Sequence, residues 1–392
     1  MAEQERALKA EQESRRKLDI LQVASHRDVH RGGAVQLVRL AEELKRRGHR
    51  VTCVFNRPSD NIDLRAFQVL RSQGIDVVGF DLDGRGEKKR FRRWVQQRDF
   101  EILHAHRDEA LVFSCQALFG LRRPLIAAGR GTCYRLKSFT WPWLFFRSGK
   151  VRRVIAVAEA VKESLLHCGV KEQKIKVVYG SVEEEDFHPE ADGLMLRTVW
   201  SGGEKVNLVG NVAALVAKKG YDIFFRAAQL VRRSIPQCRF VCVGRGKPEK
   251  YLPLLKELDL TEAVVFANHR HDMPQAMCAL DVVVSSATKG EGLTGAVREA
   301  MSCARPVVAT DVAGNGEIVQ DGHNGRLVPA RDDQALAKAI IELLQDSERA
   351  RQLGLAGRQT VLERFTNQQR GERMEHLYLA MAEESGLTTI TA

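Results

Sequence analysis

Short apolar segments rich in β-branched residues alternate with amphipathic segments along most of the 392-residue chain. In the first such pair, 17–24 is an apolar strand and 34–47 carries apolar residues at helical spacing. Strands that alternate with helices in this way predict doubly wound sheets of parallel strands. We expect strands at 17–24, 50–55, 75–80, 102–105, 124–128, 154–157 and 175–179, and again at 206–210, 239–243, 263–266, 281–285 and 306–309. The predicted fold class is therefore α/β.

The chain is too long for one ordinary hydrophobic core, and the alternating pattern restarts near residue 204. We expect a polar N-terminal tail (1–16), a first Rossmann-like domain (17–182), an acidic linker with glycines (183–203) and a second Rossmann-like domain (204–368). Ligands of open α/β sheets bind at the carboxyl ends of the strands. The two domains are therefore expected to face a central cleft.

Charge is distributed unevenly along the chain. Residues 1–180 hold 36 Lys and Arg against 21 Asp and Glu, which gives +15, whereas 181–392 hold 25 against 29, which gives −4. A basic first half indicates an anionic partner, such as a membrane surface, a phosphorylated lipid or nucleic acid. No apolar run approaches the roughly 20 residues that span a bilayer, and the N-terminus does not read as a signal peptide. The eight cysteines form no C-x-x-C pair, so reduced thiols in the cytoplasm are expected.

Aromatic and basic residues are interleaved in one stretch of the first domain, 135–147. Such a segment suits a membrane interface, with rings among the headgroups and cations on anionic lipid. A loop packed on the core is an equally good interpretation. The candidate membrane or acceptor contacts are Arg135, Lys137, Trp141, Trp143 and Arg147.

Two glutamates eight residues apart, Glu291 and Glu299, lie in a stretch that reads as loop, helix and strand up to Asp311. Eight residues of helix rise about 12 Å, which is roughly the span from the sugar of a sugar nucleotide to its ribose. One carboxylate would then reach each end of such a ligand. Alone, the pair is more typical of a solvated helix face.

Several segments, taken in order, resemble the retaining glycosyltransferases of family 4, which have the GT-B fold. The stretch from Glu291 to Asp311 resembles the family's E-x7-E signature and the run that follows it. Other matching segments are Gly32-Gly33-Ala34 with the helix through 40–49, the His-Ala-His strand end at 102–106, the first strand and Lys-Gly turn at 210–220, the glycine turn at 241–246 and the tail at 314–329. The resemblance spans about residues 17–365.

The resemblance implies transfer of a hexose-type sugar from a nucleotide sugar, such as a UDP- or GDP-hexose, to a saccharide or lipid-linked acceptor. Cell-envelope polysaccharide or lipopolysaccharide synthesis is the expected setting, in the cytoplasm or peripherally on the inner face of the membrane. No cofactor, metal or nucleic acid is expected. The Asp-Leu-Asp at 81–83 is interpreted as a polar turn, and the last helix, about 369–392, is expected to pack back on the first domain.

The resemblance also assigns roles within the donor site. Lys219 is expected to contact the donor phosphates beside a helix N-terminus, and Glu299 to accept hydrogen bonds from the ribose. Glu291 is expected to hold the donor sugar. The other donor-binding candidates are Gly32, Gly33, Asn211, Gly244, Gly292, Leu293 and Thr294, and the catalytic candidates are His106, Lys219 and Glu291.

His106 is expected beside the reacting sugar, where it would bind a donor hydroxyl or carry the acceptor's proton. His104 is expected to point to the other face of the strand and to be buried. Asn211 stands where the family often has arginine, which leaves Lys219 as the main phosphate cation, with Lys218 or Arg245 as helpers. A GT-B epimerase or phosphorylase, a nucleic-acid-binding protein and a catalytically inactive sugar-nucleotide binder remain alternatives.

Overall fold

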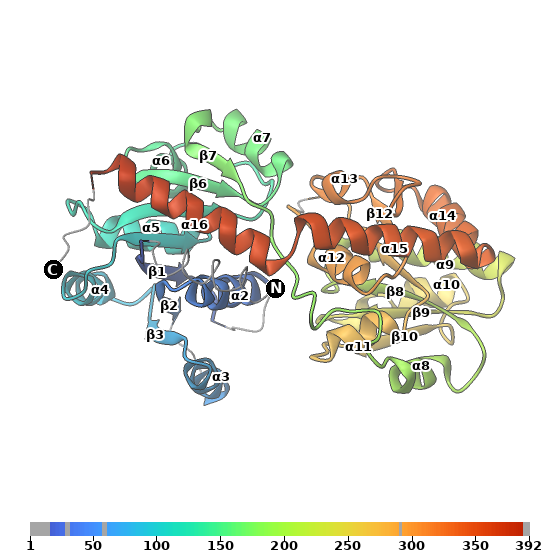
Figure 1. Cartoon of the computed structure of the whole chain (residues 1–392). Helices are drawn as coiled ribbons and strands as arrows, with labels where there is room; N and C mark the ends of the chain where they lie inside the picture. The colour runs from blue at the N-terminus through green and yellow to red at the C-terminus, as the bar shows by residue number, and fades with distance from the viewer. Residues whose placement is uncertain (1–15, 28–31, 57–60, 290–291, 387–392) are drawn as a thin grey trace, which may run out of the picture. The chain divides into compact units, whose positions relative to one another are not determined.

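The computed structural model describes residues 16–27, 32–56, 61–289 and 292–386 (Figure 1). The chain divides into two compact units, each described by itself. Unit 1 comprises Met1–Tyr179 and Asn367–Ala392, and unit 2 comprises Gly180–Thr366.

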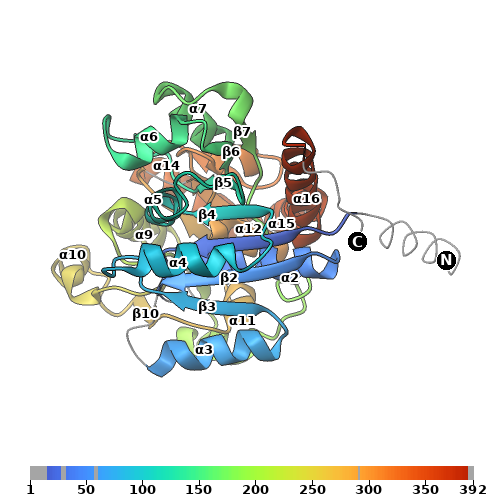
Figure 2. The same cartoon turned by 90° about the vertical axis from the view of Figure 1, so that its left-hand side faces the viewer.

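Unit 1 is built on one parallel sheet. Its strands are β1 (Asp19–Ala24), β2 (Arg50–Asn56), β3 (Asp76–Phe80), β4 (Ile102–His106), β5 (Leu125–Arg130), β6 (Val151–Ala156) and β7 (Ile175–Val177). Its helices are α2 (Gly32–Arg46), α3 (Asn61–Ser72), α4 (Glu87–Gln96), α5 (Asp108–Ala117), α6 (Trp141–Arg147), α7 (Glu159–His167), the 3-10 turn η1 (Glu172–Lys174) and α16 (Asn367–Glu384). The strand order is β3-β2-β1-β4-β5-β6-β7 (Figure 2). Helices cover both faces, so the strands carry near-continuous apolar runs.

The last helix, α16, packs on α2 within unit 1 (Figure 1). Asn367 Nδ2 donates to the carbonyl oxygen of Arg39 (2.8 Å), and Arg370 Nη1 donates to that of Gln36 (2.6 Å). The apolar side of α16 joins the same core as the sheet, through Met374, Leu377, Tyr378 and Met381. The sequence-distant C-terminal helix is therefore part of the core of unit 1.

Glu375 lies at the centre of a buried polar cluster between α16 and the end of α2. Its carboxylate accepts from Arg47 Nε and Nη2 at 2.8 and 2.6 Å and from His49 Nε2 at 3.0 Å. The N–H of Leu18 donates to His49 Nδ1 (3.1 Å), so the proton of neutral His49 is on Nε2. Burial opposes ionisation of Glu375, but the hydrogen bonds and charge of Arg47 outweigh it and lower the pKa of the carboxyl group.

Unit 2 is built on a second parallel sheet. Its strands are β8 (Asn207–Val212), β9 (Cys238–Val243), β10 (Val264–Asn268), β11 (Val282–Ser285), β12 (Val307–Thr310) and β13 (Arg326–Val328). Its helices are α8 (Leu194–Ser201), α9 (Tyr221–Ser234), α10 (Leu252–Glu257), α11 (Met273–Cys278), α12 (Gly295–Ser302), α13 (Asn315–Ile318), α14 (Asp333–Gln345) and α15 (Ser347–Arg364), with 3-10 turns η2 (Ala217–Lys219) and η3 (Pro248–Lys250). The strand order is β10-β9-β8-β11-β12-β13. Both units are therefore doubly wound and Rossmann-like.

The stretch expected as a linker, 183–203, contains helix α8. Arg197 of α8 forms an ion pair with Asp281 (2.9 Å), just before β11, and Leu196 and Trp200 are buried. These two apolar residues are four positions apart, which is the spacing of one helical face. The acidic residues and glycines around them obscured this signal in the sequence.

Among the residues that the structure describes, no helix has both the length and the apolar character that a membrane crossing requires.

Candidate functional site

Three loops at the carboxyl ends of neighbouring strands form the candidate donor site of unit 2. They follow β8, β11 and β12, which are adjacent in the sheet. Because all strands run parallel, these loops emerge at one edge, where open α/β sheets bind ligands. The predicted residues Asn211, Lys219, Gly292, Leu293, Thr294 and Glu299 belong to these loops or to the strand and helix that flank them.

The Lys219-Gly220 turn leads directly into α9. Gly220 has φ of 66°, and a Cβ there would stand 2.0 Å from the carbonyl oxygen of Ser286, so no other residue fits without a backbone shift. The Ser286 hydroxyl donates to the carbonyl oxygens of Lys219 and Gly220 at 2.9 and 3.0 Å. The turn is thus fixed on the loop after β11, beside the positive end of a 14-residue helix.

Asn211 lies behind this turn and is 2% exposed. Its Nδ2 donates to the Ser286 hydroxyl at 2.8 Å. The Asn211 side chain therefore supports Ser286, which in turn holds the Lys219-Gly220 turn. This buried position differs from that of a residue in contact with the donor phosphates. Sequence reasoning missed Ser286, although a polar residue directly after the apolar strand β11 is the signal that marks such a loop.

Gly244 brings the loop after β9 against the loop after β8. A Cβ at Gly244 would stand 2.0 Å from the carbonyl oxygen of Ala213. The backbone N–H of Ala213 donates to Val243 (2.9 Å), and that of Gly244 donates to Asn268 (2.8 Å). The glycine thus shapes the edge of the candidate site.

The loop after β11 leads into α12, which carries Glu299. Glu291 lies outside the described residues, whereas Gly292, Leu293 and Thr294 form the turn before α12. The Thr294 hydroxyl donates to Asn315 Oδ1 (2.7 Å), and Asn315 Nδ2 donates to the carbonyl oxygen of Thr310 (3.0 Å). Asn315, which sequence reasoning also missed, therefore joins the loops after β11 and β12. Glu299 is part-buried on α12.

In unit 1, Gly32 and Gly33 are the first residues of α2, the helix that follows β1. His106 is the last residue of β4, the strand next to β1 in the sheet. A Cβ at Gly33 would stand 2.6 Å from His26 Nε2, so the loop after β1 closely approaches the start of α2. Strands β1 and β4 are paired, with Ala24 opposite His106. These candidates therefore lie at the carboxyl ends of two adjacent strands.

His104 and His106 share one face of β4, contrary to the expectation that they alternate. Their ring centroids are 3.9 Å apart, because residues two apart on a strand point the same way. His104 is buried, as expected, and its Nδ1 lies 2.8 Å from the hydroxyl of Tyr378 on α16. The C-terminal helix thus contributes a hydrogen bond to the histidine pair.

The second histidine of the pair, His106, is held by Gln22 of strand β1. His106 Nε2 lies 2.9 Å from Gln22 Oε1, and an amide oxygen only accepts, so Nε2 carries the proton and Nδ1 keeps a lone pair. Burial, followed by the nearby His104 and Arg370, lowers the pKa of His106 well below its ordinary value. Burial and Arg370 lower the pKa of His104 to about 3. Both rings are therefore neutral at physiological pH, which suits hydrogen bonding better than proton transfer.

Acid should destabilise unit 1 through His104. Its pKa is about 3 when folded and near 6.5 when unfolded, so the unfolded state binds more protons between these values. The free energy of unfolding should fall as pH falls below about 6.5, by up to about 1.4 kcal/mol per pH unit. Urea unfolding between pH 7.5 and 5 should show a smaller decrease for His104→Asn than for wild type. Exposed His167→Asn is the control, and equal pH slopes in all three proteins would contradict the assignment.

The basic and aromatic segment forms a short helix, α6, and the turn before it. Phe139 and Trp141 are 86% and 56% exposed, whereas Leu136 and Phe146 are buried. The guanidinium of Arg147 lies over the Trp143 ring, 4.1 Å from its centroid. Arg135 and Lys137 are exposed. The segment is thus anchored in the core by two residues and presents aromatic and basic side chains to solvent.

The Asp81–Asp83 segment forms a turn in which the N–H of Asp83 faces Asp81 Oδ1 (3.3 Å). Within the described ranges, no group of three or more His, Cys, Asp or Glu side chains is arranged to hold a metal ion.

Comparison with known proteins gives a consistent family. Residues 30–186 match the model for Glycosyltransferase Family 4, and residues 205–346 match that for Glycosyl transferases group 1. A putative glycosyltransferase, EpsD, of Bacillus subtilis is 36% identical over 43% of this chain and 44% of its own length. A GDP-mannose-dependent α-(1-6)-phosphatidylinositol monomannoside mannosyltransferase of Mycolicibacterium smegmatis is 32% identical over 50% of this chain and 54% of its own length. The match thus spans about half of each relative.

The fold is shared with solved GT-B structures. Anabaena HepE in complex with UDP superimposes with a TM-score of 0.80 over 93% of this chain and all of HepE, at 21% identity. At this identity the likeness concerns the fold. Because a family model matches most of each sheet-bearing unit, the chain belongs to glycosyltransferase family 4, the group 1 glycosyltransferases, and has the GT-B fold.

Proposed function

We propose that this protein moves a hexose-type sugar from a nucleotide sugar, such as a UDP- or GDP-hexose, to a saccharide or lipid-linked acceptor, with retention of anomeric configuration. The observation that carries the proposal is the Lys219-Gly220 turn, which Ser286 holds at the start of α9. Breaking a glycosyl phosphate develops negative charge on the leaving diphosphate. An ammonium group and a helix N-terminus at one turn are the charges that this step needs.

The nucleoside end of the donor is assigned to Glu299. This part-buried carboxylate lies on α12, whose preceding turn is tied to Asn315 through Thr294. A carboxylate with two acceptor oxygens can receive both ribose hydroxyls. Glu291 and the N–H groups of Gly292, Leu293 and Thr294 would hold the sugar and its phosphate.

Retention is proposed to proceed by attack on the same face that the diphosphate leaves. The bond from the anomeric carbon to the phosphate oxygen breaks, a bond to the acceptor oxygen forms, and the acceptor's proton passes to the leaving phosphate. His106 would accept a hydrogen bond from a sugar hydroxyl without taking its proton, because the lowered pKa makes the ring a weak base. Glu291 then positions the sugar and is not the nucleophile.

We propose further that no metal is needed, because Lys219 and α9 neutralise the diphosphate. The acceptor is proposed to be saccharide or lipid-linked, in cell-envelope polysaccharide or lipopolysaccharide synthesis, and the enzyme to act peripherally on the cytoplasmic face of the membrane. The Mycolicibacterium relative is named for a phosphatidylinositol-based acceptor. The exposed Phe139 and Trp141, beside Arg135 and Lys137, support contact with an anionic membrane.

Calorimetric titration of the full chain with UDP-, GDP- and ADP-sugars in EDTA tests this function. One nucleotide class should bind, and Glu299→Ala should weaken it at least about a hundredfold, because hydrogen bonds to a charged group are lost. Exposed Glu257→Ala in the same unit is the matched control. Equal affinity of wild type and Glu299→Ala would refute the ribose assignment, and binding that vanishes in EDTA would refute the metal-free proposal.

A further inference from the structure

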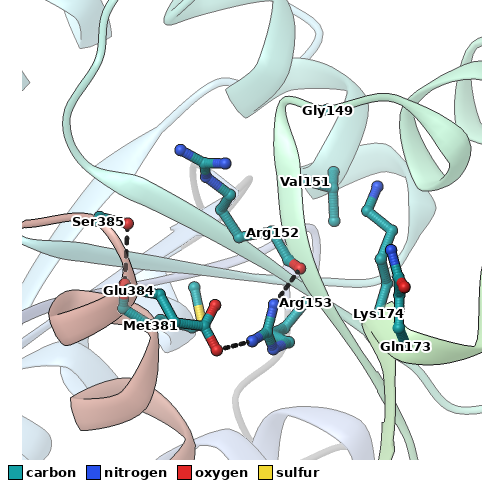
Figure 3. Close-up of a pocket in the computed structure, with 9 residues that line it drawn as sticks. All are labelled: Gly149, Val151, Arg152, Arg153, Gln173, Lys174, Met381, Glu384 and Ser385. Carbon is teal, nitrogen blue, oxygen red and sulfur yellow. Dashed lines mark hydrogen bonds and ion pairs between the residues drawn. The ribbon is translucent and has the colours of Figure 1, made fainter.

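A hollow in unit 1 is lined by none of the residues assigned above to the donor. It has a volume of about 360 Å³ and lies between the start of β6, the turn η1 and the last turn of α16 (Figure 3). Three cationic side chains, Arg152, Arg153 and Lys174, line it together with one carboxylate, Glu384. The charged groups of its lining therefore carry a formal excess of two positive charges.

Arg153 is held at the floor of the hollow. It forms an ion pair with Glu384 of α16, and its Nη1 donates to the carbonyl oxygen of Arg152 (3.1 Å) (Figure 3). Its Nε is buried and has no hydrogen-bond partner among the described residues. An orphaned guanidinium N–H is a costly feature in a protein interior, and the contacts of Arg153 with the described residues do not account for it.

Lys174 is crowded by the other cations. Burial, followed by the charges of Lys171, Arg152 and Arg153, lowers the pKa of its ammonium group. Its Nζ donates to the carbonyl oxygen of Ser148 at 2.5 Å and lies 3.5 Å from that of Arg147. Lys174 therefore lies close to other positive charges that no anion among the described residues balances at its own side chain, and an anion bound among them would reduce their repulsion.

We propose that this hollow binds a phosphate group, with Arg152, Arg153 and Lys174 as its ligands. Guanidinium forks match the tetrahedral oxygens of phosphate, and the ammonium group adds a point charge. None of these ligands is a residue assigned to the donor, so the proposal does not depend on the donor assignment.

The surroundings favour a phospholipid headgroup over a free phosphate compound. Arg147, whose carbonyl faces Lys174, is the last residue of α6, which carries exposed Trp141. A cationic hollow at one end of a short helix that carries an exposed tryptophan at its other end matches the pairing of cations and aromatic rings that favours a membrane surface. Both sources present the same phosphate chemistry, and the experiment separates them.

The first arm uses inorganic phosphate and hydrogen–deuterium exchange of the full chain. Phosphate should slow exchange in peptides covering 149–153 and 381–386, and this protection should be lost in Arg152→Gln and in Arg152→Gln/Lys174→Gln. Arg152 is exposed, so its single substitution should leave the fold intact. The same protection should persist in Lys219→Ala, which disables only the donor turn. Absence of protection in wild type, or equal protection in the hollow variants, would overturn the proposal.

The second arm measures cosedimentation with phosphatidylcholine vesicles that contain or lack phosphatidylglycerol. If the source is a headgroup, each cation removed from the hollow should weaken binding to the anionic vesicles about fivefold. Arg85→Gln/Lys88→Gln, which removes two charges elsewhere in unit 1, is the charge-matched control. Phosphate protection with vesicle binding that is equal in hollow and control variants would assign the site to a soluble phosphate compound.

Discussion

Replacing Lys219 with alanine should lower kcat about a hundred- to a thousandfold, the cost of losing one fixed group that stabilises developing negative charge. Lys219 is the residue immediately before Gly220, whose φ of 66° lets the chain turn into α9. The loss should fall on kcat more than on KM, because the diphosphate gains charge as the glycosidic bond breaks.

The measurement is release of nucleoside diphosphate from the donor that calorimetry identifies. Lys219→Arg should retain part of the rate, since it keeps the charge but changes its geometry. Lys256→Ala, an exposed lysine on α10 of the same unit, is the control. A kcat within a fewfold of wild type for Lys219→Ala would show that Lys218 or Arg245 carries the charge, and would remove Lys219 from the catalytic set.

Much of the fold followed from the sequence because the period of apolar residues differs between strands and helices. The strands β1, β4 and β8, which position the candidate site, lie within a residue or two of the ranges expected. The short strand β13 (Arg326–Val328) was not predicted, because three residues are too few to show a period. Helix α8 was missed because acidic residues and glycines surround its two apolar anchors.

The supporting residues of the site could not be read from the sequence. Ser286 lies 66 positions from Gly220, whose carbonyl it holds, and Tyr378 lies 274 positions from His104. No local pattern connects residues so far apart, because the sheet order and the return of α16 create these contacts. The orientation expected for His104 was wrong for another reason. Side chains two residues apart on a strand share a face, so His104 and His106 point the same way.

The return of α16 to unit 1 leads to the second large effect. Glu375→Ala should lower the free energy of unfolding by about 3–5 kcal/mol, the cost of removing one partner of a buried ion pair. The carboxylate is 1% exposed and receives three hydrogen bonds, two from Arg47 and one from His49. Removing it deprives the Arg47 guanidinium, whose side chain is 11% exposed, of its two short hydrogen bonds and leaves it, among the described residues, only the longer ion pair with Glu43 (3.7 Å). Glu383→Ala, on the exposed side of the same helix, should change stability by less than about 0.5 kcal/mol.

Urea unfolding at pH 7.5, followed by circular dichroism, measures both variants. Substituting both partners, as in Arg47→Met/Glu375→Leu, should cost less than Glu375→Ala alone, because apolar side chains of similar size replace the pair and Glu43 keeps its ion pair with Arg46 (2.9 Å). A double variant at least as unstable as the single one would mean that the cluster contributes through its shape and not through its charges. The histidine pair provides a second test of this cluster. If the Glu375 cluster holds α16 in place, Glu375→Ala should also break the hydrogen bond between Tyr378 and His104. The pH slope assigned to His104 should then flatten as the ring gains access to water and its pKa rises toward the ordinary value.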